Sequence, residues 1–195
     1  MRRIILTWIL MSLSYLCGQN WQTINNTNHV YDIIKRGNHI YFSTWGGVVH
    51  VQGADEGEFT QMQELKQWTT GDGLVSNDIR NLSYINFTGD LWMGSAGDGI
   101  SILGDKGLQS LDITLGLPSE RINDILEWGS YILVATAQGL AKYYYLPGVS
   151  FPLMLNQYNT INIPNLLSNN ITRLELTADS TLVLATDAGI NYVKL

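Results

Sequence analysis

The chain is organised as short apolar runs separated by polar turns. Runs of about four to six residues, rich in Val, Ile, Leu and aromatic residues, alternate with turns rich in Gly, Asn and Asp, as expected for β-strands joined by tight turns. No stretch keeps an apolar period of 3.6 residues, so we expect almost no helix. The pattern predicts an all-β protein.

An apolar segment of the type Ile-x-x-Ile recurs along the chain. A second run follows each copy and ends in a small residue and then Ser or Thr; a turn ending in Gly and a third run come next. We place four repeat units near residues 21–64, 65–107, 108–155 and 156–195. The first aliphatic residues, at intervals of 49, 43 and 49, are Val30, Ile79, Ile122 and Ile171.

Each unit predicts a small antiparallel meander that cannot bury both of its faces alone. Repeats of about 40–50 residues bury such faces by stacking their sheets around an axis. We therefore predict a β-propeller of four-stranded antiparallel meander blades, with the Ile-x-x-Ile segment as the innermost strand of each. The small residues that close the second runs fit a crowded interior; they are Ser43, Gly94, Ala135 and Ala185.

Two stretches resemble a known repeat family. Trp68 to Ile79 followed by Gly89 to Ser95, and Leu115 to Ile122, look like the two-component-regulator propeller repeat. The resemblance implies an exported propeller, as in the extracytoplasmic sensor regions of hybrid histidine kinases or in secreted proteins. The opening Trp21 to Val30 is also similar to the N-terminal propeller of a type IX secretion component. The first unit lacks the Gly-Leu loop of the family, and the fourth has Pro164 to Leu167 in its place.

The sequence is compatible with two numbers of blades. In propellers of this family an outer strand precedes the Gly-Leu loop, as Leu65 to Thr69 does here, and Trp21 to Ile24 matches that position ahead of the first unit. Pairing of Trp21 to Ile24 with Ile190 to Val193 would close a four-blade ring. The alternative, which we favour, is that the four units are the N-terminal part of a larger propeller.

The N-terminus has the layout of a secretory signal peptide. A basic start, Met1 to Arg3, precedes an uncharged run from Ile4 to Leu16 that is too short to span a bilayer. We expect residues 1–18 to be removed, with lipidation at Cys17 as the alternative, and the protein to be periplasmic or extracellular. Removal leaves no cysteine and therefore no disulfide.

The charge balance excludes some classes of partner. The chain has 11 Lys and Arg against 17 Asp and Glu; loss of Arg2 and Arg3 changes the charge from −6 to 9 − 17 = −8. An acidic chain without a basic cluster is not expected to bind nucleic acid. No second apolar run reaches 18 residues, so we expect no membrane span after signal removal.

Candidate chemistry is sparse, and we assign no catalytic residue, metal or cofactor. The three histidines, His29, His39 and His50, all lie in the first unit, whereas a zinc site needs three or four converging ligands. The sequence contains no Gly-x-Ser-x-Gly motif and no phosphate-binding loop. The run Tyr143 to Tyr145 fits a sugar-stacking platform or, as we favour, a strand end.

Strand polarity gathers one set of polar residues. Because the first two strands of a unit are antiparallel, the loop before the first and the turn after the second share one face, which we call the mouth. Such a rim suits a neutral polar ligand such as a glycan, or a protein partner, and disfavours polyanions; alternatively, its Asn residues only cap turns. The candidate ligand-binding residues are Asn28, Trp45, Asn77, Asp98, Glu120, Gln138, Asn169 and Asp187.

These observations favour a non-catalytic exported propeller that binds a ligand or partner, as in sensor regions of two-component systems or secretion-associated proteins. The alternatives are a propeller enzyme acting on polysaccharide, such as a lyase or glycosidase, and a structural docking module of a cell-envelope assembly. A scaffold hosts many functions, so the repeat alone does not decide among them.

Overall fold

The computed structural model describes residues 29–55, 58–146, 149 and 151–194. The predicted signal peptide, the predicted outer strand Trp21 to Ile24 and the rim residue Asn28 lie outside the described residues. Within them, strands form four antiparallel sheets, and the helical content is two 3-10 turns, η1 (Thr70–Asp72) and η2 (Ile113–Leu115). The all-β prediction is confirmed.

Each sheet is a meander in which consecutive strands are neighbours, and we call the sheets blades 1 to 4. Blade 1 contains β1 (Val30–Arg36), β2 (His39–Thr44), β3 (Gly47–Asp55) and β4 (Glu58–Trp68). Blade 2 contains β5 (Ile79–Ile85), β6 (Asp90–Ser95), β7 (Ile100–Gly104) and β8 (Gly107–Leu111). Blade 3 contains β9 (Ile122–Trp128), β10 (Tyr131–Thr136), β11 (Gly139–Tyr144) and β12 (Leu153–Tyr158). Blade 4 contains β13 (Ile171–Leu176), β14 (Thr181–Thr186) and β15 (Gly189–Lys194), so its described part has three strands where four are predicted.

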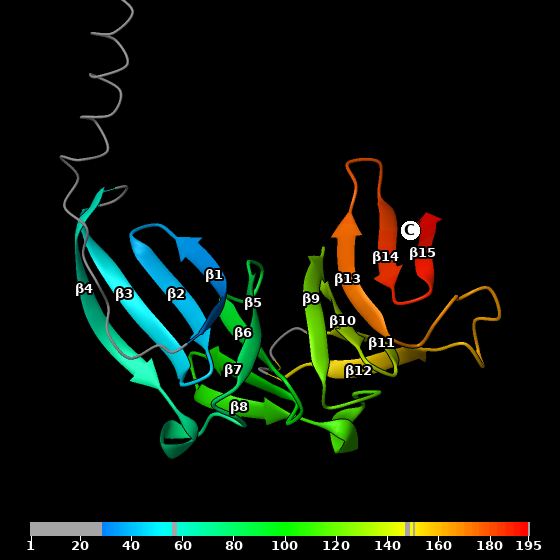
Figure 1. Ribbon diagram of the computed structural model, residues 1–195, viewed down its shortest axis with the longest axis horizontal. Helices are drawn as coiled ribbons and strands as arrows, with labels where there is room; N and C mark the ends of the chain where they lie inside the picture. Colours follow the sequence, from blue (N-terminus) through cyan, green and yellow to red (C-terminus); the bar gives the residue numbers. More distant parts are fainter. Residues whose placement is uncertain (1–28, 56–57, 147–148, 150, 195) are drawn as a thin grey trace, which may run out of the picture.

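The blades follow one another in an arc, with blade 1 and blade 4 at its two ends (Figure 1). The first strands of successive blades pack together, β1 on β5, β5 on β9 and β9 on β13, and are therefore the inner strands. Val30, Ile79, Ile122 and Ile171 are the first residues of these strands. Their predicted innermost position is confirmed.

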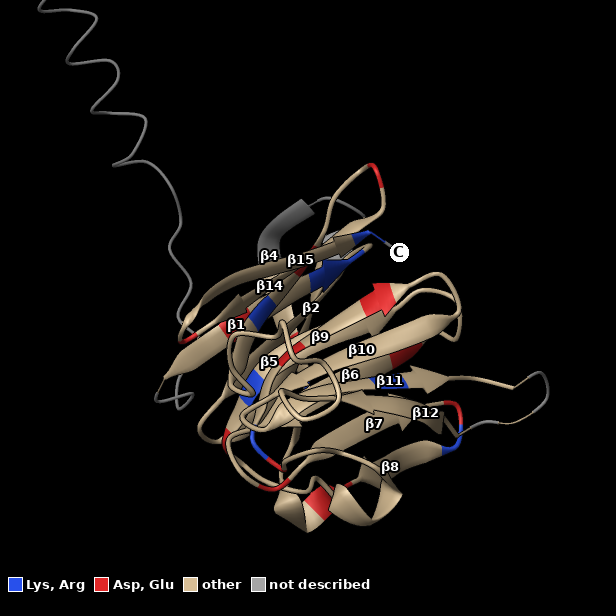
Figure 2. Ribbon diagram, turned by 90° about the vertical axis from the view of Figure 1, so that its right-hand side faces the viewer, with Lys and Arg blue, Asp and Glu red and all other residues tan. Residues whose placement is uncertain are grey.

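Hydrophobic clusters fill the three junctions between blades. Val48, Ile79 and Met93 belong to the cluster between blades 1 and 2, and Trp92 and Tyr143 to the larger cluster between blades 2 and 3. A third cluster joins blades 3 and 4. Charged side chains are few and scattered over the ribbon (Figure 2). Burial at the junctions is therefore the main force that holds the arc together.

Small residues let neighbouring blades approach closely where the second strand ends. Ser43 and Ala135 are fully buried. A Cβ on Gly94 would lie 2.6 Å from Cγ2 of Ile122 in the next inner strand, closer than packed carbon atoms come. The expectation of a crowded interior is correct at these positions.

Every inner strand has a β-bulge directly after its first residue. The register shifts between Val30 and Asp32, and equivalent shifts follow Ile79, Ile122 and Ile171. A bulge inserts one unpaired residue and re-aims the side chain that follows it. The residues that follow the bulges, which we call the latch residues, are Asp32, Asn81, Asp124 and Arg173.

The latch residues connect one inner strand to the next. The Asp32 carboxylate accepts a hydrogen bond from the backbone N–H of Leu82 at 2.8 Å, and that of Asp124 accepts one from Leu174 at 2.7 Å. Between these two links, Asn81 Nδ2 donates to Asp124 Oδ1 at 3.2 Å. All three junctions thus contain a polar bond beside the apolar cluster.

Asp124 is the central latch residue, and its removal should destabilise the whole arc. Asp124→Ala leaves the Leu174 N–H and the Asn81 amide without their acceptor in a buried site, and we expect a loss of about 3 kcal/mol in unfolding free energy. Asp124→Asn keeps one acceptor oxygen and should lose about half as much. Urea unfolding monitored by tryptophan fluorescence measures both.

The matched control for this prediction is Asp98→Ala, because Asp98 is an exposed turn carboxylate at the end of blade 2. The urea concentration at the midpoint of unfolding should be the same for this variant as for the parent chain. If Asp124→Ala unfolds at the same urea concentration as this control, the latch bonds do not stabilise the arc.

Candidate functional site

The predicted rim residues that the structure describes, all but Asn28, lie at one end of their sheets. In each blade the first residue of the inner strand pairs with the last residue of the second strand. The pairs are Val30 with Thr44, Ile79 with Ser95, Ile122 with Thr136 and Ile171 with Thr186. The loops that precede the inner strands therefore lie beside the turns that follow the second strands. This end is the mouth.

Backbone hydrogen bonds hold the mouth loops in place. In every blade the turn after the second strand donates an N–H to the segment just before the inner strand, for example Trp45 to the His29 carbonyl at 3.3 Å. Two turns also reach the next blade, since Gly47 N donates to Asn77 O and Gly99 N to Glu120 O. A Cβ on Gly47, whose φ is +107°, would overlap the Trp68 carbonyl oxygen, so this turn requires glycine.

Two of the predicted asparagines cap loops with their side chains. Asn77 Oδ1 accepts a hydrogen bond from Thr70 N at 2.8 Å, and Asn169 Oδ1 accepts one from Thr160 N at 2.7 Å. Both amide oxygens are thus occupied in shaping the loop that leads into the next blade.

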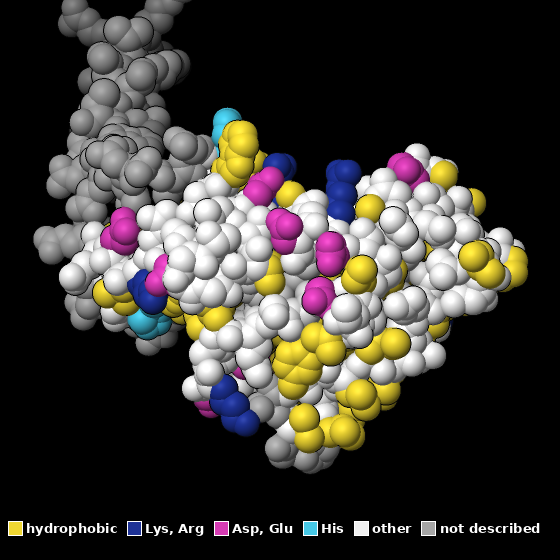
Figure 3. Space-filling view, turned by 90° about the horizontal axis from the view of Figure 1, so that it is seen from below, with side chains coloured by type: hydrophobic (Ala, Val, Ile, Leu, Met, Phe, Trp, Pro, Cys, Tyr) yellow, Lys and Arg dark blue, Asp and Glu magenta, His cyan; other side chains and the backbone are white. Residues whose placement is uncertain are grey.

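The other predicted rim residues are more open. Trp45, Asp98, Gln138 and Asp187 are exposed, and Glu120 is half-buried. Figure 3 looks at the molecule from below and shows carboxylates near the middle of the face and hydrophobic side chains gathered towards one side. The Trp45 indole, 59% exposed, is the largest ring available at this end of blade 1.

Trp45 belongs to an aromatic group at the mouth of blade 1. The His29 ring lies 6.3 Å from that of Trp45 and 6.4 Å from that of Tyr31. The Arg80 guanidinium from blade 2 lies over the Tyr31 ring at 4.1 Å, and Asp78 holds it with two hydrogen bonds of 2.5 and 2.9 Å. Rings and guanidinium together form one continuous surface.

A polar hollow of about 300 Å³ continues this surface across blades 2 to 4. Arg80 and Arg121 supply guanidinium donors, and Thr172 supplies a hydroxyl. Asn123 lines it as well, its Nδ2 donating to Ile171 O at 2.7 Å and to Asn170 Oδ1 at 3.1 Å. The hollow can hold a ligand that offers hydrogen-bond acceptors to these donors.

Sequence reasoning missed most of this surface. Tyr31, Arg80, Asn123 and Thr172 are the bulged residues of the four inner strands. The one available signal was that each repeated segment carries a polar or aromatic residue directly after its first aliphatic residue. Strict strand alternation gives that position no special role, because it does not include the bulge.

Two carboxylates near the mouth, Asp187 and Asp124, are poorly placed for acid catalysis. Hydrogen bonds from Ser168 and Asn170 lower the pKa of Asp187, which keeps it ionised. Burial raises the pKa of Asp124, yet its oxygens already accept hydrogen bonds from Leu174 N, Ile125 N and Asn81. A general acid needs a raised pKa and free access to the substrate, and neither group combines the two.

The tyrosine run lies at the end of β11, and two of its three rings are buried instead of exposed as a platform would require. Tyr143 is fully buried and Tyr145 nearly so, and burial raises the pKa of both phenols. The Tyr145 hydroxyl donates to Asp90 at 2.9 Å and that of Tyr143 to the Leu115 carbonyl at 3.3 Å. Both rings therefore serve the junction with blade 2.

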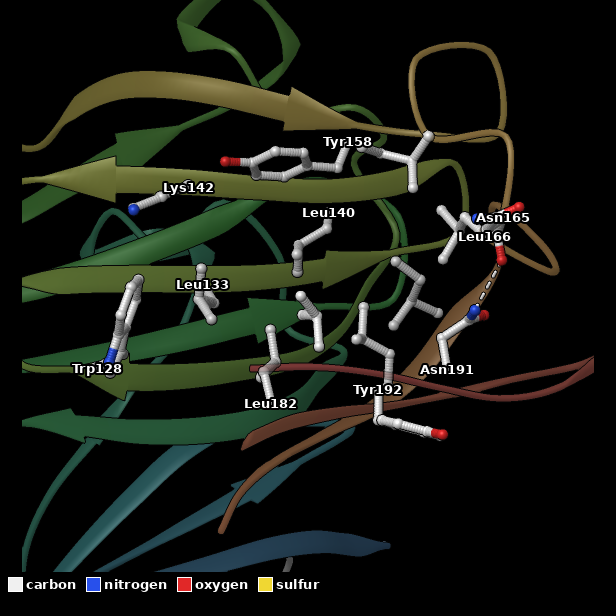
Figure 4. A pocket seen from close by; sticks show the side chains of 14 residues that line it. Trp128, Leu133, Leu140, Lys142, Tyr158, Asn165, Leu166, Leu182, Asn191 and Tyr192 are labelled. Atoms are coloured by element: carbon white, nitrogen blue, oxygen red, sulfur yellow. Dashed lines mark hydrogen bonds between the residues drawn. The ribbon is translucent and has the colours of Figure 1, made fainter. Parts of the chain in front are cut away.

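A second cavity, away from the aromatic group, is an apolar pocket of about 390 Å³ between blades 3 and 4 (Figure 4). Leu133 and Leu140 face Leu182 across it, and Asn191 donates to the Asn165 carbonyl at one end at 2.8 Å. Val193 lines it at the strand position that Tyr143 fills in blade 3. The smaller side chain leaves the space.

A histidine pair lies on the face of blade 1 that meets blade 2. His39 Nδ1 and His50 Nε2 are 2.8 Å apart, so one ring donates to the other. The Tyr41 ring stacks on His50 at 4.3 Å, and the Trp68 ring lies 5.9 Å away. Burial and the neighbouring His39 lower the pKa of His50.

The described residues contain neither a cluster of metal-ligating side chains nor a long apolar helix. In the described ranges, no group of three His, Cys, Asp or Glu side chains is placed to hold a metal ion. None of the helices described here has the length and apolar character needed to cross a membrane.

Comparison with known proteins shows the fold. No protein-family model matches the chain, and no curated protein matches it. Among solved structures it is similar to the extracellular domain of the putative hybrid two-component system BT4673 from B. thetaiotaomicron (19% identity, TM-score 0.61), covering 87% of this chain and 22% of that one. It is also similar to PorZ, an essential bacterial surface component of the type-IX secretion system of Porphyromonas gingivalis (14% identity, TM-score 0.58), covering 89% of this chain and 22% of that one.

A third similar structure is the computationally designed protein Ika4, with 12% identity and a TM-score of 0.59 over 91% of this chain and 99% of that one. The chain spans about a fifth of the length of BT4673 and PorZ. The similar structures thus include both kinds of protein that the repeat resemblance names. At these identities the likeness establishes the fold.

The histidine pair predicts a loss of stability in mild acid. Because the pKa of His50 is lowered in the folded chain, the unfolded chain binds more protons below its ordinary pKa of about 6.5. The unfolding free energy should therefore fall as the pH drops from about 7.5 to 5.5. His50→Phe keeps a ring to stack on Tyr41 and should reduce this fall in denaturant titrations at each pH.

The control is His29→Phe, because His29 is exposed at the mouth and lies outside the pair. This variant should keep the pH dependence of the parent chain. If the unfolding free energy of the His50→Phe variant falls with pH as steeply as that of the parent chain, the histidine pair does not cause the loss of stability in acid.

Proposed function

We propose that the protein is an exported, non-catalytic propeller module that binds a neutral oligosaccharide at its mouth. The observation that carries the proposal is the continuous surface formed by Trp45, Tyr31 and Arg80 with the polar hollow beside it. Exposed rings offer flat apolar faces to sugar rings, and guanidinium, amide and hydroxyl groups bond their hydroxyls.

The location of the surface supports this proposal. It lies on loops and bulges carried by a rigid array of sheets, where binding residues commonly occur. The similar structures include an extracellular domain, that of BT4673, and a bacterial surface component, PorZ, which supports export of this chain as well.

The electrostatics favour a neutral ligand over a polyanion. Asp98, Glu120 and Asp187 stand among the mouth loops and repel extended polyanions. Arg80 is already paired with Asp78, which leaves Arg121 as the guanidinium of the hollow without an ion pair among the described residues. A single guanidinium that is free to donate hydrogen bonds suits a neutral ligand rich in hydroxyl groups.

Substitution in the aromatic group or in the polar hollow should weaken binding without unfolding the chain. Trp45→Ala and Arg121→Ala each remove an exposed group, and we expect at least a tenfold rise in dissociation constant, about 1.4 kcal/mol. A glycan array selects the oligosaccharide, and calorimetric titration then measures the affinity.

The control is Phe87→Ala, since Phe87 is an exposed ring in the β5–β6 turn at the opposite end of its sheet. Its affinity should equal that of the parent chain. Binding that survives both mouth substitutions would place the ligand elsewhere, and cleavage of the bound oligosaccharide would favour the alternative of a propeller enzyme.

A further inference from the structure

A third cavity lies between blades 1 and 2, at the end of the sheets opposite the mouth. Its volume is about 320 Å³, and it lies beside the end of β1, the start of β2 and the β5–β6 turn. Both blades that form it have four described strands. We call it the basal hollow; its side chains are those of Arg36, His39, Tyr41, Tyr84, Leu91 and Leu103.

The basal hollow combines a polar wall with an apolar one. Arg36 and His39 of blade 1 supply hydrogen-bond donors, whereas Leu91 and Leu103, paired on neighbouring strands of blade 2, supply apolar surface. None of the described residues that line it is Asp or Glu. In a chain with more acidic than basic residues, a hollow with a guanidinium and no carboxylate indicates an anionic ligand with an apolar part.

The Arg36 guanidinium is held in place without a carboxylate partner. It lies over the Tyr84 ring, 3.7 Å from the ring centroid, and its Nη1 donates to Asn86 Oδ1 at 3.3 Å. The ion pairs found among the described residues do not include Arg36. Its remaining N–H groups can therefore bond a ligand.

A carboxylate of blade 3 fixes the turn on which Arg36 rests. Glu127 accepts hydrogen bonds from Asn86 N at 2.9 Å, from Asn86 Nδ2 at 2.7 Å and from Phe87 N at 3.2 Å. Both oxygens of Glu127 are thus bonded to the β5–β6 turn. The turn in turn presents Asn86 Oδ1 to Arg36, so the donor is positioned before a ligand arrives.

His39 offers one ring nitrogen to the basal hollow. Its Nδ1 is bonded to His50 Nε2 at 2.8 Å, and none of the hydrogen bonds among the described residues involves its Nε2. When His50 Nε2 donates its proton to His39 Nδ1, the proton of His39 is on Nε2. The histidine pair then presents a second donor beside Arg36.

We propose that the basal hollow binds a small organic carboxylate, with its carboxylate group on Arg36 and His39 and its apolar body against Leu91 and Leu103. A guanidinium matches a carboxylate with two parallel hydrogen bonds, and the hollow has one guanidinium. A phosphate group has three strong acceptor oxygens and suits a cluster of such groups. The site is separate from the mouth and takes a different class of ligand.

Benzoate is the probe that tests the site, and benzamide is its neutral counterpart of nearly equal size. We expect benzoate to bind with a dissociation constant of about 1 mM or below, and benzamide at least tenfold more weakly, because only the carboxylate pairs with the guanidinium. In nitrogen–proton correlation spectra, benzoate should shift the amide signals of Gly89 and Gly104, which line the hollow. The signals of Gly99 and Gly139, in turns of the mouth, should stay in place. Sodium chloride at equal concentration serves as the blank.

Substitution of Arg36 tests the contact itself. Arg36→Gln removes the guanidinium from an exposed position and should raise the dissociation constant for benzoate at least tenfold. Arg36→Lys keeps the charge without the fork and should give an intermediate value. The matched control is Lys106→Gln, since Lys106 is an exposed cation in the β7–β8 turn at the same end and does not line the hollow. The control should bind benzoate as the parent chain does.

Three results would overturn the proposal. If the signals of Gly89 and Gly104 stay in place up to about 20 mM benzoate, the basal hollow does not bind a carboxylate. If benzamide binds as tightly as benzoate, the hollow recognises the ring and not the charge. If Arg36→Gln and Lys106→Gln have the same affinity for benzoate, Arg36 makes no direct contact with the carboxylate.

Discussion

The arc depends on the β-bulge near the start of every inner strand. The bulge adds one residue to the inner strand and so changes the direction in which the following side chain points. The latch residue that follows it is thereby turned towards the neighbouring blade. There Asp32 and Asp124 accept a backbone N–H of the next inner strand. Apolar burial supplies most of the attraction between blades, but it has no direction. The polar bonds fix how one sheet is placed against the next.

Much of the fold could be predicted from the sequence because the repeat carries it. Four copies of one aliphatic spacing, each followed by a small residue and a Gly turn, identify the inner strands and the crowded ends of the second strands. The sequence could not show which residues the bulge displaces, since Tyr31, Arg80, Asn123 and Thr172 share no side-chain chemistry. The fourth strand of blade 4 was predicted from Trp21 to Ile24, which lies outside the described residues.

The candidate site was predictable in place and less so in detail. The described rim residues lie at one end of the sheets, as strand polarity predicts. Residue type alone does not separate a side chain that holds a loop from one that is open to a ligand. Asn77 and Asn169 hold loops, while Trp45 is open, and only the hydrogen bonds distinguish them. The sequence does not indicate a role for Arg80 and Arg121, because the residues that they meet at the mouth are distant in the chain. Arg80 lies over Tyr31, and both arginines line the hollow together with Thr172.

The latch residues alternate along the chain between a carboxylate and a hydrogen-bond donor, and this alternation has a consequence for how such a chain can grow. Propellers lengthen by duplication of blades, and each new blade must meet its neighbours through the same inner-strand position. Duplicating blade 1 alone would place two carboxylates at facing positions, and duplicating blade 4 alone would do the same with two guanidinium groups. Copying blades 1 and 2 together, or 3 and 4 together, preserves the order of acceptor and donor. In this chain the order of acceptor and donor therefore repeats over a pair of blades, although the structural unit is one blade.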